Sequence, residues 1–480
     1  MTSIWRLPAG ELASRIRARE VSSRDVVEAF LTRIQALDGQ VNAFALLDAE
    51  GALKAADAAD NALASGAAVG SLHGVPVSVK DLVATRGMVT AFGSHAFADN
   101  VPAEDAEAVA RLRAAGAIII GKTTTPELGH KVLTDSPAYG YTRNPWDVSK
   151  SPGGSSGGAA VSAAMGFSPL AVSTDGAGSG RIPASCCGIV GLKPTIGAVP
   201  HETNSDLFGS LTCIGAMARS VSETALLYSV MHGPDPRDPW SLAGNAGPVN
   251  LPSDPINVLK GLRIRYLPRT QNSYLDPEVE RLCASMVARL AGEGAEVRGD
   301  DPIGDWNLAA ALKLMRAYQA ARFGHLLDRW RDSMDPALVE GLEQGRAFSG
   351  EEVAHAIADR TRHYRSMQSL FADADVLVTP TVSVPSLDIE QRSNEPLVLD
   401  GNTLGPLRET WYCYTIPFNP SGNPAISVPC GFSGAGLPVG LQIVGPWHSE
   451  PLLLSIAAAI EALSPWADRW PALAVEGNPQ

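Results

Sequence analysis

Residues 151–185 read SPGGSSGGAAVSAAMGFSPLAVSTDGAGSGRIPAS, a stretch in which two glycine-rich loops alternate with regular structure. The first loop, SPGGSSGG at 151–158, continues into small side chains that predict a helix. An apolar run at 170–173 then predicts a buried strand, which leads into the second loop, STDGAGSGRIPAS at 173–185. Such loops present backbone N–H groups and let neighbouring elements approach closely. The stretch therefore predicts an α/β core with candidate chemistry in both loops.

The same alternation of helix and strand runs along the rest of the chain. A helix is predicted from residue 22 to about 37, where Ser22 and Asp25 can form a capping box. Further helices are predicted at about 49–65 and at about 104–115, the latter ending against Gly116. Apolar runs that predict strands lie at 75–79, 117–120, 170–173, 262–267, 375–380, 425–429 and 439–444. Together they predict an α/β layered fold around a central sheet.

One stretch separates the chain into two halves. Residues 232–255 (HGPDPRDPWSLAGNAGPVNLPSDP) are rich in Pro, Gly and Asp. Because strand signals resume near 425–444, we expect one sheet shared by both halves. We divide the chain into four parts. Residues 1–70 are an N-terminal helical segment packed on the core, and residues 71–230 are the core that carries the site. Residues 231–255 are a connecting loop, and residues 256–480 are a C-terminal half that completes the sheet and the substrate pocket.

Composition excludes several classes of protein. The 480 residues are 45% hydrophobic and carry a net charge of −13, without a basic stripe, so nucleic acid is not an expected partner. No apolar run reaches the roughly 18 residues of a membrane span, and the start lacks the order of a signal peptide, so we expect a cytoplasmic protein and no membrane partner. The six cysteines form no C-x-x-C pair and the nine histidines are scattered. We therefore expect no metal and no cofactor.

A phosphate-loop pattern occurs at Gly116–Thr123, which reads GAIIIGKT. Its loop positions are Ala-Ile-Ile-Ile, which favour a strand, and Pro126 falls where the following helix should be under way. Nucleotide binding is one interpretation. We favour the other, a buried strand that ends at Gly121.

Two serines compete for the role of nucleophile. Ser155 satisfies G-x-S-x-G, but residues 144–154 read as a loop, whereas a hydrolase elbow needs a strand there. Solvated serines in a glycine-rich turn are the alternative for this loop. Ser179 does follow a predicted strand, and the residues before it could present N–H groups to an oxyanion. Lys80 ends another apolar strand, where desolvation would make it a usable base, although a surface lysine is the commoner outcome.

Three segments in this order and spacing resemble the amidase signature family: LHGVPVSVKD, SPGGSSGG and TDGAGSGRIPAS. Supporting matches are GKTTTPELG, YTRNPWD, GIVGLKPT, SGNPAISVP and GLPVGLQIVG. The resemblance runs from about residue 22 to 465, is strongest at 71–200 and weakest at about 250–370. It implies a central mixed β-sheet covered by helices on both faces.

The resemblance also implies a role for each site residue. Ser179 is the implied nucleophile, Ser155 the relay serine held by a cis peptide bond, and Lys80 the base that later acts as general acid. Four consecutive backbone N–H groups are implied to hold the oxyanion: those of Gly176, Ala177, Gly178 and Ser179. Ser156 and Arg181 match supporting positions, and we interpret Asp175 as structural.

This chain departs from the family pattern beside the nucleophile. The family usually has two glycines before that serine and an apolar residue after it, where this chain has Ala177-Gly178 and Gly180. The Cβ of Ala177 disfavours positive φ and narrows the space near the scissile carbonyl, which works against bulky acyl groups. Gly180 adds freedom behind the nucleophile.

We therefore expect a metal-independent amidohydrolase that acts on a small-molecule amide and releases carboxylate and amine or ammonia. Pocket walls are expected from about 300–370, from 202–209 and from 410–417. Trp411, Tyr412 and Tyr414 suggest an apolar or aromatic acyl pocket for aryl or medium aliphatic amides, with plain core packing as the alternative. Rival hypotheses are the glutaminase subunit of a tRNA-dependent amidotransferase and a non-catalytic binding protein. A homodimer is expected by frequency alone.

Overall fold

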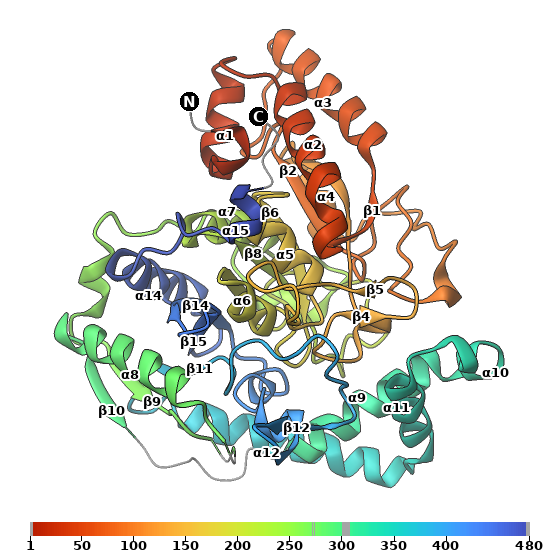
Figure 1. Cartoon of the computed structure of the whole chain (residues 1–480), viewed down its shortest axis with the longest axis vertical. Helices are drawn as coiled ribbons and strands as arrows, with labels where there is room; N and C mark the ends of the chain where they lie inside the picture. Colours follow the sequence, from red (N-terminus) through yellow and green to blue (C-terminus); the bar gives the residue numbers. More distant parts are fainter. Residues whose placement is uncertain (1–2, 271, 273, 300–307, 477–480) are drawn as a thin grey trace.

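A single mixed sheet of 11 strands forms the centre of the molecule (Figure 1). The computed structural model describes residues 3–270, 272, 274–299 and 308–476. The strands lie in the order β1 (Phe44–Leu47), β3 (Ile118–Thr123), β2 (Pro76–Lys80), β6 (Leu170–Asp175), β8 (Cys213–Ala218), β7 (Val190–Lys193), β14 (Ala425–Phe432), β15 (Pro438–Val444), β11 (Val376–Pro380), β9 (Arg263–Tyr266) and β10 (Glu296–Gly299). Strands β3, β2 and β6 are parallel neighbours, as are β11, β9 and β10.

Fifteen helices are described around this sheet and in the C-terminal half. They are α1 (Ala9–Arg17), α2 (Ser23–Val41), α3 (Ala49–Ala64), α4 (Glu107–Ala114), α5 (Gly157–Ala164), α6 (Arg181–Cys187), α7 (Val221–Met231), α8 (Pro277–Gly292), α9 (Leu308–Phe323), α10 (Leu327–Trp330), α11 (Pro336–Ala347), α12 (Gly350–Ser369), α13 (Leu407–Thr410), α14 (Glu450–Leu463) and α15 (Ala472–Glu476). Two small hairpins lie apart from the main sheet: β4 (Asp135–Ser136) with β5 (Gly140–Tyr141), and β12 (Pro396–Leu399) with β13 (Asn402–Pro406).

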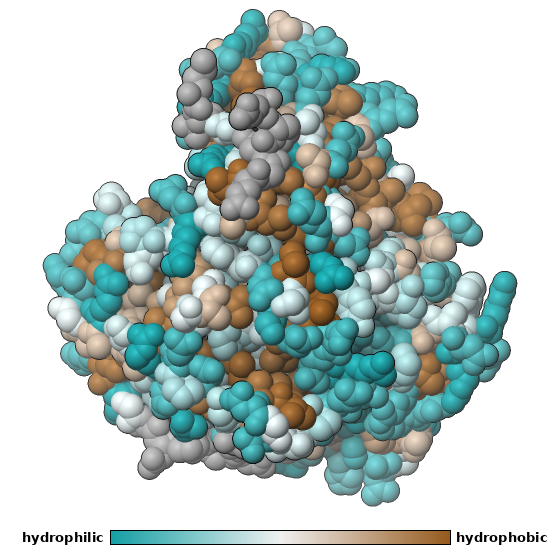
Figure 2. Space-filling model, in the orientation of Figure 1, coloured by the Kyte–Doolittle hydropathy of each residue, from teal (hydrophilic) through white to brown (hydrophobic). Residues whose placement is uncertain are grey.

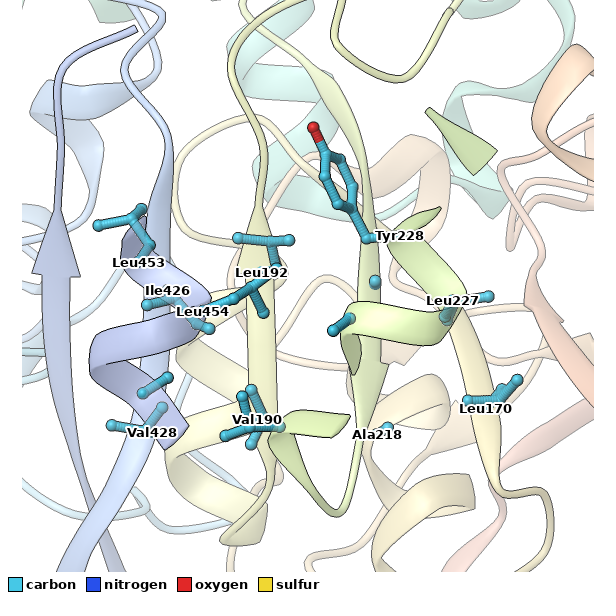
Figure 3. Close-up of a cluster of buried hydrophobic side chains, with 14 of the residues drawn as sticks. Leu170, Val190, Leu192, Ala218, Leu227, Tyr228, Ile426, Val428, Leu453 and Leu454 are labelled. Carbon is cyan, nitrogen blue, oxygen red and sulfur yellow. The ribbon is translucent and has the colours of Figure 1, made fainter. Parts of the chain in front are cut away.

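Helices cover both faces of the sheet because its strands are apolar on both sides. On one face, α7 and α14 pack over Val190, Leu192, Ile426 and Val428 (Figure 3). On the opposite face, α5 packs on β6 and β8, and α6 packs on β14 and β15. A strand buried on both faces has an unbroken apolar run rather than an alternating pattern.

The alternation of side chains along β2 directs Lys80 towards α5. Val77 and Val79 belong to the same hydrophobic cluster as the buried residues of α7 and α14. Ser78 lies on the other face, where its hydroxyl is 2.8 Å from that of Ser168 and accepts a hydrogen bond from Ser162 of α5 at 3.2 Å. Because successive side chains point to opposite faces, Lys80 shares the α5 face with Ser78.

The sheet joins the two halves of the chain through β7 and β14, whose antiparallel pairing sets Leu192 opposite Ile426. This confirms the expectation of one shared sheet. The segment proposed as an N-terminal helical unit also contributes β1, which pairs with β3 at the sheet edge. Residues 232–255 run between α7 and the 3₁₀ turn Pro255–Leu259, and include a second such turn at Pro239–Ala243.

Most of the predicted elements are present with small shifts. The capping box of Ser22 and Asp25 begins α2 as predicted. Helix α4 begins later than predicted, at Glu107, since Ala106 is its N-cap residue. The prediction that β3 ends at Gly121 is wrong: the strand continues through Lys122 to Thr123.

The outside of the molecule mixes residue types. On the face shown in Figure 2, hydrophobic residues lie among hydrophilic ones. No helix within the described ranges combines the length and the apolar character needed to cross a membrane.

Candidate active site

The Lys80 amine group lies among three hydroxyls at the end of β2. Its Nζ is 2.7 Å from Ser155 Oγ, 2.8 Å from Ser156 Oγ and 2.9 Å from Thr174 Oγ1. The Lys80 side chain is fully buried, so the prediction of a desolvated lysine is confirmed and the surface-lysine alternative is wrong. Thr174, which sequence reasoning missed, is the residue before Asp175 at the end of β6.

Burial lowers the pKa of Lys80 well below its ordinary value, and the charge of Asp175 only partly offsets this. A neutral amine has two N–H donors and one lone pair. Ser156 donates its single proton to the carbonyl of Thr174 at 3.0 Å, so its oxygen accepts from Lys80. The lone pair of Nζ is therefore left for the hydroxyl proton of Ser155 or of Thr174.

The loop that carries Ser155 has the conformation that the family resemblance implies. The peptide bond between Gly154 and Ser155 is cis. Gly153 has a φ of +74°, and a Cβ on Gly154 would lie 2.8 Å from the backbone of Leu133. Thr134 anchors the loop by donating to the Gly153 carbonyl at 2.7 Å. The glycines of this loop are therefore needed for its path.

Ser179 is joined to the Lys80 group through the backbone. The N–H of Ser156 donates to the carbonyl of Ser179 at 3.1 Å, which fixes the two loops against each other. Ser179 is 6% exposed, whereas Ser156 is completely buried. The two glycine-rich loops predicted from the sequence thus meet at one place, on the α5 face of the sheet.

One of the four predicted oxyanion donors is already engaged. The N–H of Gly178 donates to the Asp175 carboxylate at 2.7 Å, so the prediction for Gly178 is corrected. This bond holds the turn before Ser179, where Gly178 has a φ of +116°. Gly176, Ala177 and Ser179 are left as the candidate donors.

Asp175 forms a buried ion pair with Arg181. Arg181 Nε is 2.9 Å from Asp175 Oδ2 and Arg181 Nη2 is 2.9 Å from Asp175 Oδ1, a bidentate geometry with both side chains fully buried. Burial alone would raise the pKa of Asp175, but the charge and hydrogen bonds of Arg181, the charge of Lys193 and the Gly178 amide outweigh it and hold this pKa below its ordinary range. Asp175 therefore stays ionised, and it accepts from the N–H groups of Gly178 and Gly180 on either side of Ser179.

Two further residues of this network come from the C-terminal half and were missed. Asn419 donates to the Asp175 carbonyl at 2.9 Å, and Gln442 accepts from Arg181 at 2.7 Å. Gln442 is the one polar residue of the strand VGLQIV (439–444), and a buried amide in such a strand was the signal available. Asn419 lies in a loop and gave no comparable signal.

The residues that depart from the family pattern fit the backbone without strain. Ala177 is not among the described non-glycine residues with positive φ, and its carbonyl accepts from Thr415 Oγ1 at 2.9 Å. Gly180 has a φ of −93°, and a Cβ there would lie 3.4 Å from Asp175 and Ser173. The backbone at both positions would thus accept a side chain.

One cavity adjoins this group through Thr174 and shares five wall residues with a second cavity: Leu128, Asn204, Thr212, Arg322 and Phe323. Thr174 lines the cavity of about 330 Å³, and a Cβ on Gly176 would lie 3.3 Å from Thr212 Oγ1. The other cavity, of about 780 Å³, lies between residues 204–212 and α9. Both the 202–209 loop and part of the 300–370 region thus line these cavities, the smaller of which reaches Thr174. Residues 300–307 lie outside the described ranges.

The three aromatic residues predicted to form the substrate pocket separate into two groups. Trp411 and Tyr414 are completely buried, with Nε1 of Trp411 donating to Val384 O and the Tyr414 hydroxyl donating to Pro268 O. The structure therefore corrects their assignment as pocket walls and makes them core residues. Tyr412 lines a third cavity of about 310 Å³, on the other side of Met315 and Gln319.

The phosphate-loop pattern does not form a phosphate site. Its positions 118–123 belong to β3, whose backbone groups pair with β1 and β2. Lys122 is buried, with Nζ 2.5 Å from Val83 O and 2.8 Å from Thr90 Oγ1. Burial lowers the pKa of Lys122 to about 8, although Asp81 and Asp105 oppose this. No trio of potential metal ligands occurs within the described ranges.

Comparison with known proteins identifies the relatives of this chain. It matches the Amidase family over residues 25–454. An acylamidase of Rhodococcus erythropolis is 36% identical over 471 residues, which cover 97% of each chain. A glutamyl-tRNA(Gln) amidotransferase subunit of Acidothermus cellulolyticus is 37% identical over 494 residues, covering 96% of this chain and 95% of that one.

Solved structures give the same result. The structure of a bacterial aryl acylamidase of the amidase signature family superposes on 99% of this chain and 99% of its own, with a TM-score of 0.89 and 28% sequence identity. The fold, the paired serine loops and these matches over nearly the whole length agree. This chain belongs to the amidase signature family.

Proposed function

We propose that this protein is a serine amidohydrolase in which Ser179 attacks the amide carbonyl, with Ser155 as the relay and Lys80 as the base. The observation that carries the proposal is the buried Lys80 amine, 2.7 Å from the Ser155 hydroxyl and with a lowered pKa. A serine hydroxyl is a weak nucleophile unless its proton has an acceptor. A neutral lysine supplies that acceptor without histidine.

In the acylation step, the Ser179 oxygen bonds to the carbonyl carbon as its proton passes to Ser155, whose own proton passes to Lys80. The carbonyl π electrons move onto oxygen, which the N–H groups of Gly176, Ala177 and Ser179 would stabilise. One such donor is typically worth about 3–4 kcal/mol of transition-state stabilisation. Lys80 then returns a proton through Ser155 to the amide nitrogen, the C–N bond breaks, and amine or ammonia leaves.

Deacylation repeats the same proton path with water. A water oxygen attacks the Ser179 ester while its proton moves through Ser155 to Lys80. The tetrahedral intermediate then collapses, and the Ser179 oxygen leaves and recovers a proton along the reverse path. The acid that is released loses its proton to solvent, so the products are a carboxylate, a proton and the free enzyme, and Lys80 ends each half-reaction in its starting protonation state.

The substrates we propose are aryl or medium aliphatic amides. Phe92, Leu128 and Phe323 give the cavity beside Thr174 an apolar wall. The names of two relatives, an acylamidase and an aryl acylamidase, are in keeping with this choice. Most of the affinity for such groups would come from apolar contact.

Hydrolysis of 4-nitroanilides tests the proposal, with release of 4-nitroaniline as the readout. Ser179→Ala and Lys80→Ala should each lower kcat by about 10⁴-fold or more, as expected when one member of a coupled catalytic group is lost. Ser149→Ala is the matched control, since Ser149 is exposed and bonded locally to Asp147. Full activity of Ser179→Ala would refute the assignment.

A glutaminase function within an amidotransferase is the second candidate, favoured by the 37% identity to the amidotransferase subunit of Acidothermus cellulolyticus. It predicts that ammonia is released from glutamine only when the partner subunits of such an enzyme are added. Turnover of anilides by the isolated chain, with no glutaminase activity in the presence of those partners, would exclude it.

A further inference from the structure

Arg322 lies at the end of α9 and lines two cavities, the smaller of which is also lined by Thr174, the hydroxyl partner of Lys80. Among the described residues around the smaller cavity, it is the one side chain with a permanent charge; every other wall residue is apolar or polar without a permanent charge. Burial lowers the pKa of His201, the other titratable residue in this wall, which favours its neutral form at neutral pH. The charge in this cavity is therefore that of Arg322.

The guanidinium of Arg322 has no carboxylate partner within the described part of the chain. Two arginines nearby are engaged: Arg346 donates to the Gly324 carbonyl at 2.6 Å, and Arg360 donates to the carbonyls of Gly209, Ser210 and Pro420. Arg322 instead lies against the ring of its neighbour Phe323, with 4.7 Å between the guanidinium carbon and the ring centroid. Arg322 as a whole is solvent-exposed, and the partial desolvation that it undergoes lowers its pKa with no acidic group to oppose the shift.

One acidic residue, Asp206, lines the larger cavity together with Arg322. Its carboxylate accepts from the Gly209 N–H at 2.8 Å, and its charge acts on Tyr318 and Arg360. It does not neutralise Arg322. An arginine that lines a binding cavity without a carboxylate partner presents a fork of N–H donors to whatever enters.

We infer that Arg322 binds a carboxylate group on the substrate, so that this amidase prefers amides that carry a second, ionised carboxyl group. The inference rests on the proposed function and narrows its substrate class. Apolar side chains of the same cavity, Phe92, Leu128 and Phe323, would hold the carbon chain or ring between the scissile amide and that carboxylate. Arg322 is a specificity residue here and takes no part in the proton path.

Two pairs of amides test the inference and find the side of the scissile bond that carries the carboxylate. The acyl-side pair is N-succinyl-4-nitroaniline and its uncharged analogue with a 4-oxopentanoyl group. The amine-side pair is 4-acetamidobenzoate and its uncharged analogue 4-acetamidoacetophenone. The quantity compared is the ratio of kcat/KM for the charged amide to that for its neutral analogue.

In one of the two pairs, Arg322→Gln should lower this ratio about 10- to 100-fold, the range typical of a charge-assisted hydrogen bond, and Arg322→Lys should restore part of it. Raising the ionic strength should lower the ratio for the native chain more than for Arg322→Gln. Arg281→Gln, at a 64% exposed position on α8, is the matched control and should leave the ratio unchanged. An unchanged ratio in both pairs for Arg322→Gln would overturn the inference.

Failure of the proposed function gives a different result. If the native chain cleaves none of the four amides, binding of the same charged and neutral amides is measured by calorimetry on Ser179→Ala with and without Arg322→Gln. Tighter binding of a charged amide that depends on Arg322 supports the carboxylate site even then. Equal binding of charged and neutral amides in both proteins overturns it.

Discussion

Gly178 precedes the proposed nucleophile in a conformation that side chains rarely adopt. Its φ is +116°, and an added Cβ would overlap the Thr415 side chain. We predict that Gly178→Ala disrupts the turn and lowers kcat/KM by at least 10-fold, because displacement of reacting groups by about 1 Å can cost about 100-fold in rate. Gly180→Ala should retain most activity, because φ there is −93° and the added Cβ would make ordinary van der Waals contacts at 3.4 Å. Anilide hydrolysis checks the pair, and equal losses would contradict this account of the turn.

The lowered pKa of Lys80 predicts the pH dependence of activity. The neutral amine is the active form, so kcat/KM should rise with pH and level off once Lys80 is deprotonated. Because burial depresses this pKa well below 10.5, the plateau should begin well below pH 10.5. A rise that centres near pH 10.5 would show that Lys80 is not desolvated in solution. Profiles of kcat/KM from about pH 5 to above the ordinary pKa of a lysine side chain provide the measurement.

At the residue scale, local sequence predicted the members of the site better than their partners. Lys80, Ser155 and Ser179 stand in glycine-rich or strand-end segments whose pattern indicates chemistry. A single hydrogen bond leaves no such pattern in the sequence. The bond from the Gly178 N–H to Asp175 and the contact of Thr174 with Lys80 could therefore not be predicted. Trp411 shows the opposite error, since an aromatic side chain gives the same signal in a core and in a pocket.

The packing of helix α5 requires its backbone to approach the sheet closely at Gly158. A Cβ on Gly158 would lie 2.6 Å from the Ala43 carbonyl oxygen, with Thr124 also in contact, whereas Gly39 in α2 has nothing within 4 Å of an added Cβ. Gly158→Ala should lower the free energy of unfolding by about 1–3 kcal/mol through overpacking. Gly39→Ala should raise it by about 0.5–1 kcal/mol through helix propensity. Denaturant unfolding of both variants checks this, and a stabilised Gly158→Ala would contradict the packing described.

Elements with strong apolar runs were predictable, and those with small or polar residues were not. β14 contains the apolar run AISVP, and β15 contains the apolar run VGLQIV. β8 (CIGAMA) is rich in small residues, and its burial comes from β6 and β7 at its edges and from α7 and α5 on its faces. The extension of β3 through Lys122 depends on carbonyl and hydroxyl partners at Val83 and Thr90, which lie elsewhere in the chain.

For the whole molecule, the shared sheet predicts that the two halves do not separate when the chain is cut. A protease site placed at 245–247, where all three residues are exposed, would break the covalent link. β7 pairs with β14 across the cut, and Arg181 donates to Gln442 at 2.7 Å. The cut protein should therefore elute as one species at the size of the intact chain. Separate elution of the two fragments in native buffer would contradict a common core.

Sequence predicted this shared sheet from the strand signals after residue 425, but it could not give the strand order. The pairing of β7 with β14 joins segments far apart in the chain, and it is fixed by burial on both faces rather than by any local pattern. The same long-range pairing brings Asn419 and Gln442 to the base of the Ser179 loop.

Peptide mapping by mass spectrometry after reaction with a fluorophosphonate identifies the serine that acts as nucleophile. We expect a phosphonyl adduct on Ser179 in the native chain and a much weaker adduct in Lys80→Ala, because the hydroxyl then lacks its proton acceptor. An adduct on Ser155, or none on either serine, would contradict the assignment of nucleophile and relay.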